Sequence, residues 1–347
     1  MRASIALFGG VSLSLLAACG SEGPSSADAS GTSLTATTGI TPTSGETSSG
    51  TSSGGGGGVT GATSDGTTTG ADDTAGDEDD VVFDLGMMPD APPVEEGCAG
   101  IDFLFVIDNS GSMGAQQTQL LGSFGGFIAG IEDSLEDVDS FHVGVVTSDN
   151  YADNEPGCQS LGDLVTYTRD NGACTPFADG FRFLTDSDDI QTEFPCIGQV
   201  GTFGSGYEEP ISALVAAVSE EKAQPGACNE GFIRDDSILV VVVVTDDPPV
   251  DGFFDDAEPT IDTSGWAPAV LAAKDNNPEA VVVIGFIPWQ DVSCVPLTSE
   301  SPNLINFVDA FGEQGIKASV CEPDYGPVFQ STLDTIKTTC DNFDPQG

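Results

Sequence analysis

Ile101-Asp102-Phe103-Leu104-Phe105-Val106-Ile107-Asp108-Asn109-Ser110-Gly111-Ser112-Met113 is the stretch of this 347-residue chain that decides its fold. Its first half is apolar and is typical of a buried β-strand. The strand ends at the carboxylate of Asp108, and the hydroxyls of Ser110 and Ser112 follow at alternate positions. A turn after the strand can direct these three oxygens at one point, and hard divalent cations prefer oxygen ligands. The sequence therefore predicts part of a divalent-cation site at the end of this strand.

Apolar strands alternate with amphipathic helices from Cys98 onward. Further strands are predicted at residues 141–147, 238–244 and 281–287, and edge strands near 181–184 and 317–320. Apolar residues at helical spacing predict helices at residues 120–135, 211–218, 304–311 and 329–340. The alternation predicts an α/β fold, with a doubly wound, mostly parallel sheet and helices on both faces. Residues 149–200 have no such pattern, and we interpret them as a cysteine-containing elaboration.

Asp108-x-Ser110-x-Ser112 after an apolar strand resembles the start of the metal-ion-dependent adhesion site of the von Willebrand factor A (vWA) family, which begins with Asp-x-Ser-x-Ser. The resemblance implies two further oxygen ligands, a Thr from a second loop and an Asp after a later buried strand. Thr202, in a loop before a predicted helix, and Asp246, just after the 238–244 strand, match these two at the rim where parallel sheets place their sites. The resemblance covers about residues 98 to 343. Each residue alone is also an ordinary turn or cap residue, and the specificity lies in the full set: Asp108, Ser110, Ser112, Thr202 and Asp246.

The resemblance implies a Rossmann-like vWA fold and a protein-binding module rather than an enzyme. It also implies a bound Mg²⁺, or Mn²⁺ or Ca²⁺, with one coordination position open for a carboxylate from a partner protein. One departure is Asp247, where many members of the family carry Gly. Together with Asp251 and Asp255 it makes the following loop strongly acidic. This loop is either solvated or holds a second cation through Asp247, Asp251 and Asp255.

Eight of the nine cysteines lie in the predicted domain, from Cys98 to Cys340, and none forms a Cys-x-x-Cys pair. In an exported protein this number predicts four disulfides. In a vWA-like fold the two ends of the domain lie on the same side of the sheet, so we expect Cys98 to pair with Cys340. The remaining cysteines pair most simply as Cys158–Cys174, Cys196–Cys228 and Cys294–Cys321, although the irregular segment could interleave them.

The amino-terminal region has the features of an exported lipoprotein. Residues 1–18 have the layout of a signal peptide. Leu16-Ala17-Ala18-Cys19 resembles the bacterial lipobox, in which the cysteine is lipidated; ordinary cleavage with Cys19 incidental is the alternative. Residues 19–97 are rich in Ser, Thr and Gly and end in acidic residues, which predicts a disordered tether. We expect an outer-membrane lipoprotein of the cell envelope, facing either the periplasm or the surface.

The formal net charge of −48 excludes nucleic acid as a natural partner, because such a surface repels phosphate. The single histidine, His142, lies in a predicted strand, so neither a histidine-based zinc site nor a catalytic triad is expected. The expected function is divalent-metal-dependent protein binding and adhesion. Two alternatives remain open: a metal-dependent hydrolase using Asp108 and Asp246, and a structural envelope protein whose metal site only stabilises the fold.

Overall fold

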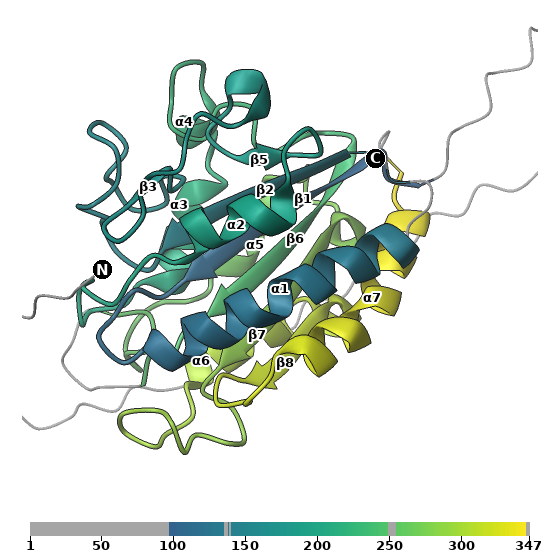
Figure 1. The fold of residues 1–347 in the computed structure, drawn as a ribbon. Coiled ribbons are helices and arrows are strands. Elements are labelled where there is room, and N and C mark those ends of the chain that lie inside the picture. Colours follow the sequence, from purple (N-terminus) through teal and green to yellow (C-terminus); the bar gives the residue numbers. More distant parts are fainter. Residues whose placement is uncertain (1–96, 135–137, 139, 249–254, 345–347) are drawn as a thin grey trace, which may run out of the picture. The chain divides into compact units, whose positions relative to one another are not determined.

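A computed structural model of the chain describes residues 97–134, 138, 140–248 and 255–344. The predicted signal peptide, Cys19 and the predicted tether lie outside these residues. The described part has a six-stranded sheet with the order β5-β2-β1-β6-β7-β8 (Figure 1). These strands are β1 (Gly100–Ile107), β2 (Ser140–Thr147), β5 (Leu184–Thr185), β6 (Ser237–Val244), β7 (Val281–Ile287) and β8 (Gly315–Ser319). β5 pairs antiparallel with β2, and the other pairs are parallel, so the prediction of a mostly parallel sheet is confirmed.

Helices cover both faces of the sheet. One face carries α1 (Gly114–Ser134), α2 (Ile190–Gly198) and α7 (Gly326–Asp341). The other carries α3 (Pro210–Ala217), α5 (Trp266–Ala272) and α6 (Pro302–Asp309), while the short α4 (Glu220–Ala223) follows α3 in the chain. Figure 1 shows α1 and α7 side by side in front of the sheet. The predicted doubly wound architecture is therefore confirmed.

The strand β1 lies in the middle of the sheet, and all eight of its residues are buried. Alternate side chains of a strand point to opposite faces. Phe103 packs edge-on against Phe127 of α1, with ring centroids 5.6 Å apart. Leu104 and Val106 belong to the second core, which includes residues of α3, α5 and α6. The burial of β1 at every position is thus the direct consequence of two cores, one on each side.

The segment 149–200 contains a helix that the sequence analysis did not predict. In α2, Asp189 caps the amino end by accepting a hydrogen bond from Thr192 N at 3.2 Å. Phe194 is fully buried and stacks on Phe124 of α1. The same segment contributes a small hairpin, β3 (Tyr167–Thr168) with β4 (Gly172–Ala173), and the 3₁₀ turn η1 (Ala178–Gly180). Further 3₁₀ turns are η2 (Pro278–Ala280) and η3 (Gly312–Gln314).

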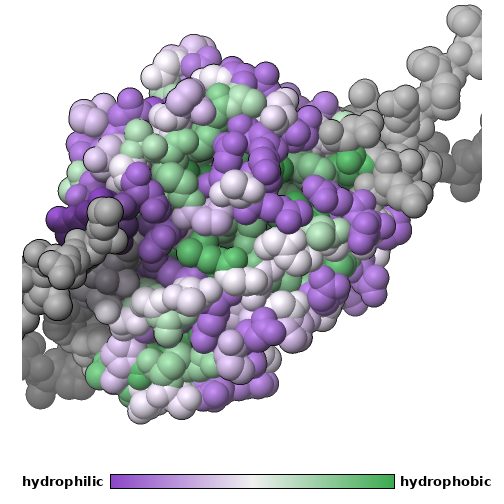
Figure 2. Space-filling model, in the orientation of Figure 1, coloured by the Kyte–Doolittle hydropathy of each residue, from purple (hydrophilic) through white to green (hydrophobic). Residues whose placement is uncertain are grey.

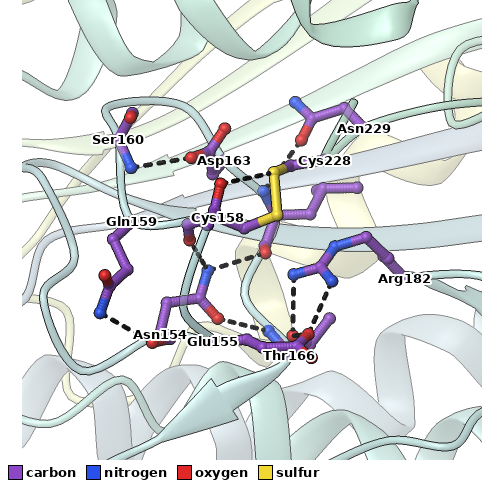
Figure 3. Close-up of a disulfide and its surroundings, with 12 residues drawn as sticks. Asn154, Glu155, Cys158, Gln159, Ser160, Asp163, Thr166, Arg182, Cys228 and Asn229 are labelled. Carbon is purple, nitrogen blue, oxygen red and sulfur yellow. Dashed lines mark hydrogen bonds and ion pairs between the residues drawn. A yellow bond between two sulfur atoms is a disulfide. The ribbon is translucent and has the colours of Figure 1, made fainter. Parts of the chain in front are cut away.

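Two of the four expected disulfides are confirmed and two are wrong. Cys98 bonds to Cys340, with Cα atoms 4.9 Å apart, and Cys294 bonds to Cys321. The expected pairs Cys158–Cys174 and Cys196–Cys228 do not form. The structure pairs Cys158 with Cys228 instead (Figure 3), and it pairs Cys174 with Cys196.

The reason for the different pairing is that residues 154–166 pack against a distant part of the chain rather than folding locally. The side chain of Asn229 accepts a hydrogen bond from Leu164 N and donates one to Gly162 O, at 3.0 and 2.8 Å. These bonds hold the two stretches together next to the Cys158–Cys228 bond (Figure 3). Because Cys158 is bonded to Cys228, Cys174 bonds to Cys196 and links the β3–β4 hairpin to α2.

Candidate metal centre

The register of the sheet brings three loops together at one edge. β1 is parallel to both β2 and β6, and Ile107 is opposite Thr147 in one and Val244 in the other. The residues that follow these three are Asp108, Ser148 and Thr245, which therefore leave the sheet side by side. This is the carboxyl edge of the parallel strands, where open α/β sheets place their sites.

Asp108 is fully buried and accepts three hydrogen bonds. Ser110 N and Thr245 Oγ1 each donate to it at 2.7 Å, and Ser148 Oγ donates at 3.3 Å. Burial raises the pKa of Asp108, while the hydrogen bonds from Ser110 and Thr245 lower it. These bonds fix the orientation of the carboxylate. The sequence analysis did not single out Thr245 or Ser148, although each directly follows a predicted strand.

The serines of the motif connect Asp108 to Asp246. Ser110 Oγ lies 3.3 Å from Ser112 Oγ, and Ser112 Oγ donates to Asp246 Oδ1 at 2.9 Å. The other oxygen, Asp246 Oδ2, is buried and has no hydrogen-bond partner in the described part of the chain. Burial, and then the neighbouring Asp108, raise the pKa of Asp246 to about 6. The structure thus brings four of the five predicted ligands into one hydrogen-bonded group with an oxygen left free.

The fifth predicted ligand, Thr202, lies in a loop held against the same turn. Gln117 Nε2 donates to Gly201 O at 2.7 Å and to Asp108 O at 2.9 Å. A methyl group added at Gly114 would come within 3.8 Å of Thr202 Cγ2. Thr202 is half-buried. The structure therefore places Thr202 beside the turn that carries the two serines.

The two described aspartates of the expected second site, Asp247 and Asp255, are buried rather than solvated. Asp247 is 1 % exposed and Asp255 3 % exposed, and both lie close to Glu208, a residue that the sequence analysis did not select. Asp251, the third residue of the expected second site, lies outside the described residues. Burial, followed by the charges of Asp255 and Glu208, raises the pKa of Asp247 to about 10. Burial, followed by Asp108 and Asp246, raises the pKa of Glu208 to about 8.

None of these five carboxylates pairs with a basic side chain in the part of the chain that the structure describes. Of the eight Lys and Arg residues, Arg2 lies outside that part, and Lys274 Nζ donates to the backbone oxygen of Arg234. The others form the ion pairs Arg169–Asp153, Arg182–Glu155, Lys222–Asp163, Arg234–Asp102, Lys317–Asp309 and Lys337–Asp341. Buried charges are normally paired or bound to metal. The free oxygens and the all-oxygen donor set at this edge of the sheet fit a hard divalent cation.

Asp102, in contrast, is a buried carboxylate that does pair with a basic side chain. It lies toward the opposite end of β1, is fully buried, and accepts from Arg234 Nε at 2.7 Å. His142 of β2 lies beside it, with Nδ1 2.8 Å from Phe232 O and 3.5 Å from Asp102 Oδ1. His142 is therefore a sheet residue in a structural network, as predicted, and takes no part in the acidic edge.

Two of the five candidate ligands, Ser112 and Asp246, line a cleft of about 290 Å³. Its other lining residues are Gly206, Glu208, Asp247, Pro248, Asp255, Pro296 and Leu297. Its wall is partly apolar, because Pro248, Pro296 and Leu297 contribute to it, and Leu297 is 51 % exposed. Figure 2 shows apolar surface at the lower edge of the view, over the loop that joins β7 to α6. The cleft thus combines a carboxylate floor with an apolar border.

No protein-family model and no curated protein matches the chain. Among solved structures, proximal thread matrix protein 1 from the mussel byssus is 13 % identical, with a TM-score of 0.35, over 70 % of this chain and 49 % of that one. A von Willebrand factor type A protein from Catenulispora acidiphila is 13 % identical, with a TM-score of 0.33, over 68 % and 42 %. Manganese-loaded TRAP protein from Plasmodium vivax is 15 % identical, with a TM-score of 0.35, over 71 % and 76 %.

The match thus spans half or less of the first two of these chains.

Proposed function

We propose that this chain carries a vWA-like domain that binds a protein partner through a divalent cation, and that it is not an enzyme. The observation that carries the proposal is the group formed by Asp108, Ser110, Ser112 and Asp246, which is held in place by hydrogen bonds and leaves Asp246 Oδ2 free. A buried carboxylate oxygen with no donor is costly, and a bound cation would satisfy it.

The proposed ligands are Asp108, Ser110, Ser112, Thr202 and Asp246. They would hold Mg²⁺, with Mn²⁺ or Ca²⁺ as substitutes, because all of them offer oxygen. The bound cation would supply positive charge for a carboxylate of the partner protein at an edge that has no basic side chain of its own among the described residues. Thr245 and Ser148 would act indirectly, by holding the Asp108 carboxylate in its orientation.

The cleft favours binding over turnover. Hydrolysis by a serine needs a general base that removes the proton of its hydroxyl. The Ser112 hydroxyl forms a hydrogen bond to Asp246, which is itself a proposed metal ligand, and His142 lies in the network around Asp102 and Arg234. The apolar border formed by Pro296 and Leu297 suits the carbon atoms next to a partner's carboxylate.

The domain is proposed to act outside the cytoplasm. The described residues contain four disulfides, and such bonds persist in oxidising compartments. Among the described helices, none has the length and apolar character that crossing a membrane requires. Membrane attachment would come from a lipid on Cys19, with the protein displayed on the cell envelope.

A pull-down from envelope extract tests this function. The purified chain is immobilised and incubated with extract in Mg²⁺ or in a chelator, alongside Asp246→Asn and Asp262→Asn. Asp262 is exposed and serves as the matched control. The proposal expects a partner that is captured by wild type and Asp262→Asn in Mg²⁺, and lost both with chelator and with Asp246→Asn.

Capture that is unaffected by chelator and by Asp246→Asn would overturn the proposed function. Metal-dependent turnover of ester or phosphate substrates by the wild type, lost in Asp246→Asn, would support a hydrolase instead. A fall in melting temperature with chelator, without any specific partner, would support a purely structural metal.

A further inference from the structure

We propose that Glu208, Asp247 and Asp255 form a second divalent-cation site, separate from the site of Asp108 and Asp246. Each of the three residues offers one carboxylate oxygen, and these oxygens all lie within 4.8 Å of one another. The residues come from three parts of the chain: the approach to α3, the end of β6, and the stretch before α5. The proposal stands whether or not the first site binds a protein partner.

The strongest observation is the state of the Asp247 side chain. It is 1 % exposed, and neither of its two carboxylate oxygens has a hydrogen-bond partner among the described residues. Asp255 Oδ1 is also buried and without a partner. A carboxylate with both oxygens removed from water and from every donor is stable only if it is protonated or bound to a cation. The cluster therefore contains three buried carboxylate oxygens that have no donor among the described residues.

The backbone around Asp247 is fixed, unlike its carboxylate. Asp247 N donates to Thr245 Oγ1 at 3.1 Å, and Asp247 O accepts from Ser301 Oγ. The same Thr245 hydroxyl donates to Asp108. The main chain is therefore satisfied on both sides while the side chain is not, as expected for a residue positioned to bind something.

The neighbouring Asp256 shows that a buried carboxylate in this stretch can have all of its oxygens hydrogen-bonded. Asp256 is as buried as Asp255, but its Oδ2 accepts from Ile211 N and Ser212 N, each at 2.7 Å, and its Oδ1 accepts from Ser212 Oγ at 2.7 Å. Asp256 therefore serves the first turn of α3. Its backbone N also donates to Glu208 O at 3.0 Å, which ties the stretch carrying Asp255 to the residue that precedes α3.

The ligand chemistry indicates Ca²⁺ or Mn²⁺. Three carboxylates offer as many as six oxygens, and Ca²⁺ accepts six to eight oxygen ligands, including bidentate carboxylates. The three residues line the same cleft as Ser112 and Asp246. A cation here would also neutralise charge next to the first site.

The experiment is a count of bound cations on the whole purified chain. Isothermal calorimetry with CaCl₂ and with MnCl₂ is run on wild type, Asp247→Asn, Glu208→Gln and Asp108→Ala, with the exposed Asp262→Asn as control. Far-ultraviolet circular dichroism in chelator checks that each variant is folded, and Glu208→Gln replaces Asp247→Asn if the latter is not. We expect two equivalents for wild type and control, and one equivalent for each folded variant of either site.

Three other results would each decide whether the second site exists. Two equivalents retained by both Asp247→Asn and Glu208→Gln would overturn the second site. Loss of both equivalents in folded Asp108→Ala would also overturn it, because a site separate from Asp108 would keep its own equivalent. A single wild-type equivalent that is lost in Asp247→Asn but kept in Asp108→Ala would support the second site and contradict the first.

Discussion

The Ser112 hydroxyl donates a 2.9 Å hydrogen bond to Asp246 Oδ1 across 134 positions of the sequence. Ser112 follows the central strand β1, and Asp246 follows its neighbour β6. The bond forms only when the two strands pair in the observed register, in which Ile107 is opposite Val244. Cation binding at this point should therefore require the correctly paired strands, and it should stabilise the folded chain.

Replacing Asp108 should abolish cation binding at the first site. Asp108→Asn keeps the shape of the side chain but removes its charge, and Asp108→Ala removes every oxygen. In Asp108→Ala the buried Thr245 hydroxyl also loses its acceptor, which should cost about 1–3 kcal/mol of stability. Titration calorimetry with MgCl₂ measures the binding, and thermal unfolding measures the stability. Binding of Mg²⁺ by either variant at the wild-type affinity would refute the ligand assignment.

Thr245 should act as a positioning residue. Thr245→Val keeps the volume but removes the hydrogen bonds to Asp108 and from Asp247 N. Because outer contacts of this kind typically contribute 10- to 100-fold to metal affinity, we expect binding to weaken by about tenfold or more. Thr245→Ser retains the hydroxyl and should restore most of the affinity. A purely structural role would lower the melting temperature of Thr245→Val while leaving cation affinity unchanged.

The chain without cations should lose stability as pH rises. Burial raises the pKa of Asp246 to about 6 and of Glu208 to about 8, above the values of roughly 4 for unfolded carboxyls. The folded chain therefore holds these protons more tightly, and the resulting stability is full below about pH 4 and is lost as pH rises through 6 and 8. Scanning calorimetry in chelator should show a melting temperature several degrees lower at pH 8 than at pH 5.

The control for this effect is the double variant Asp246→Asn with Glu208→Gln, which cannot release these protons. Its melting temperature should depend less on pH than that of the wild type. Added Mn²⁺ should stabilise the wild type more at pH 8 than at pH 5, since the cation competes with protons for the same oxygens. Identical pH slopes for wild type and double variant would contradict the prediction.

The parts of the fold that the sequence predicted are those carried by local pattern. The run at 238–244 is apolar at every position because β6 has a core on each face, and Asp246 lies two residues after its end. Glu208 gave no such signal, since a carboxylate before a helix is ordinary. Its importance arises only when the fold brings Asp247 and Asp255 beside it. The predicted pairing of Cys158 was wrong for the same reason. Asn229 binds Leu164, which is 65 residues away in the sequence, and this long-range contact fixes the surroundings of Cys158.

The helix α2 was missed by the prediction for a different reason. Ile190, Phe194 and Ile197 have helical spacing, and Asp189 has the character of an amino-terminal cap. Pro195 inside the helix and the surrounding irregular sequence masked this pattern. Here the information was present locally, so the miss reflects a competing signal rather than a long-range contact.

Cys19 should anchor the chain to a membrane. The basis is Leu16-Ala17-Ala18-Cys19 at the end of the apolar amino-terminal segment. Cys19→Ser should move the protein from the membrane fraction to the soluble fraction, and metabolic labelling with a fatty acid should be lost with it. Membrane association that survives Cys19→Ser would argue for another mode of attachment.

The Cys98–Cys340 bond should stabilise the domain more than the Cys174–Cys196 bond does. The first joins residues 242 apart, and the second joins residues 22 apart. In the loop-entropy model a disulfide stabilises by restricting the unfolded chain, which gives about 5 kcal/mol for the long loop and about 3 kcal/mol for the short one. The two double variants, each with both cysteines of one pair changed to Ser, are compared by thermal unfolding in the same buffer with saturating Mn²⁺. Cys98 and Cys340 are also buried, at 5 % and 4 % exposure, so the added hydroxyls lower stability further in the first variant. A larger loss of melting temperature in the Cys174/Cys196 variant would show that the hairpin and α2, rather than closure of the domain ends, depend most on a covalent link.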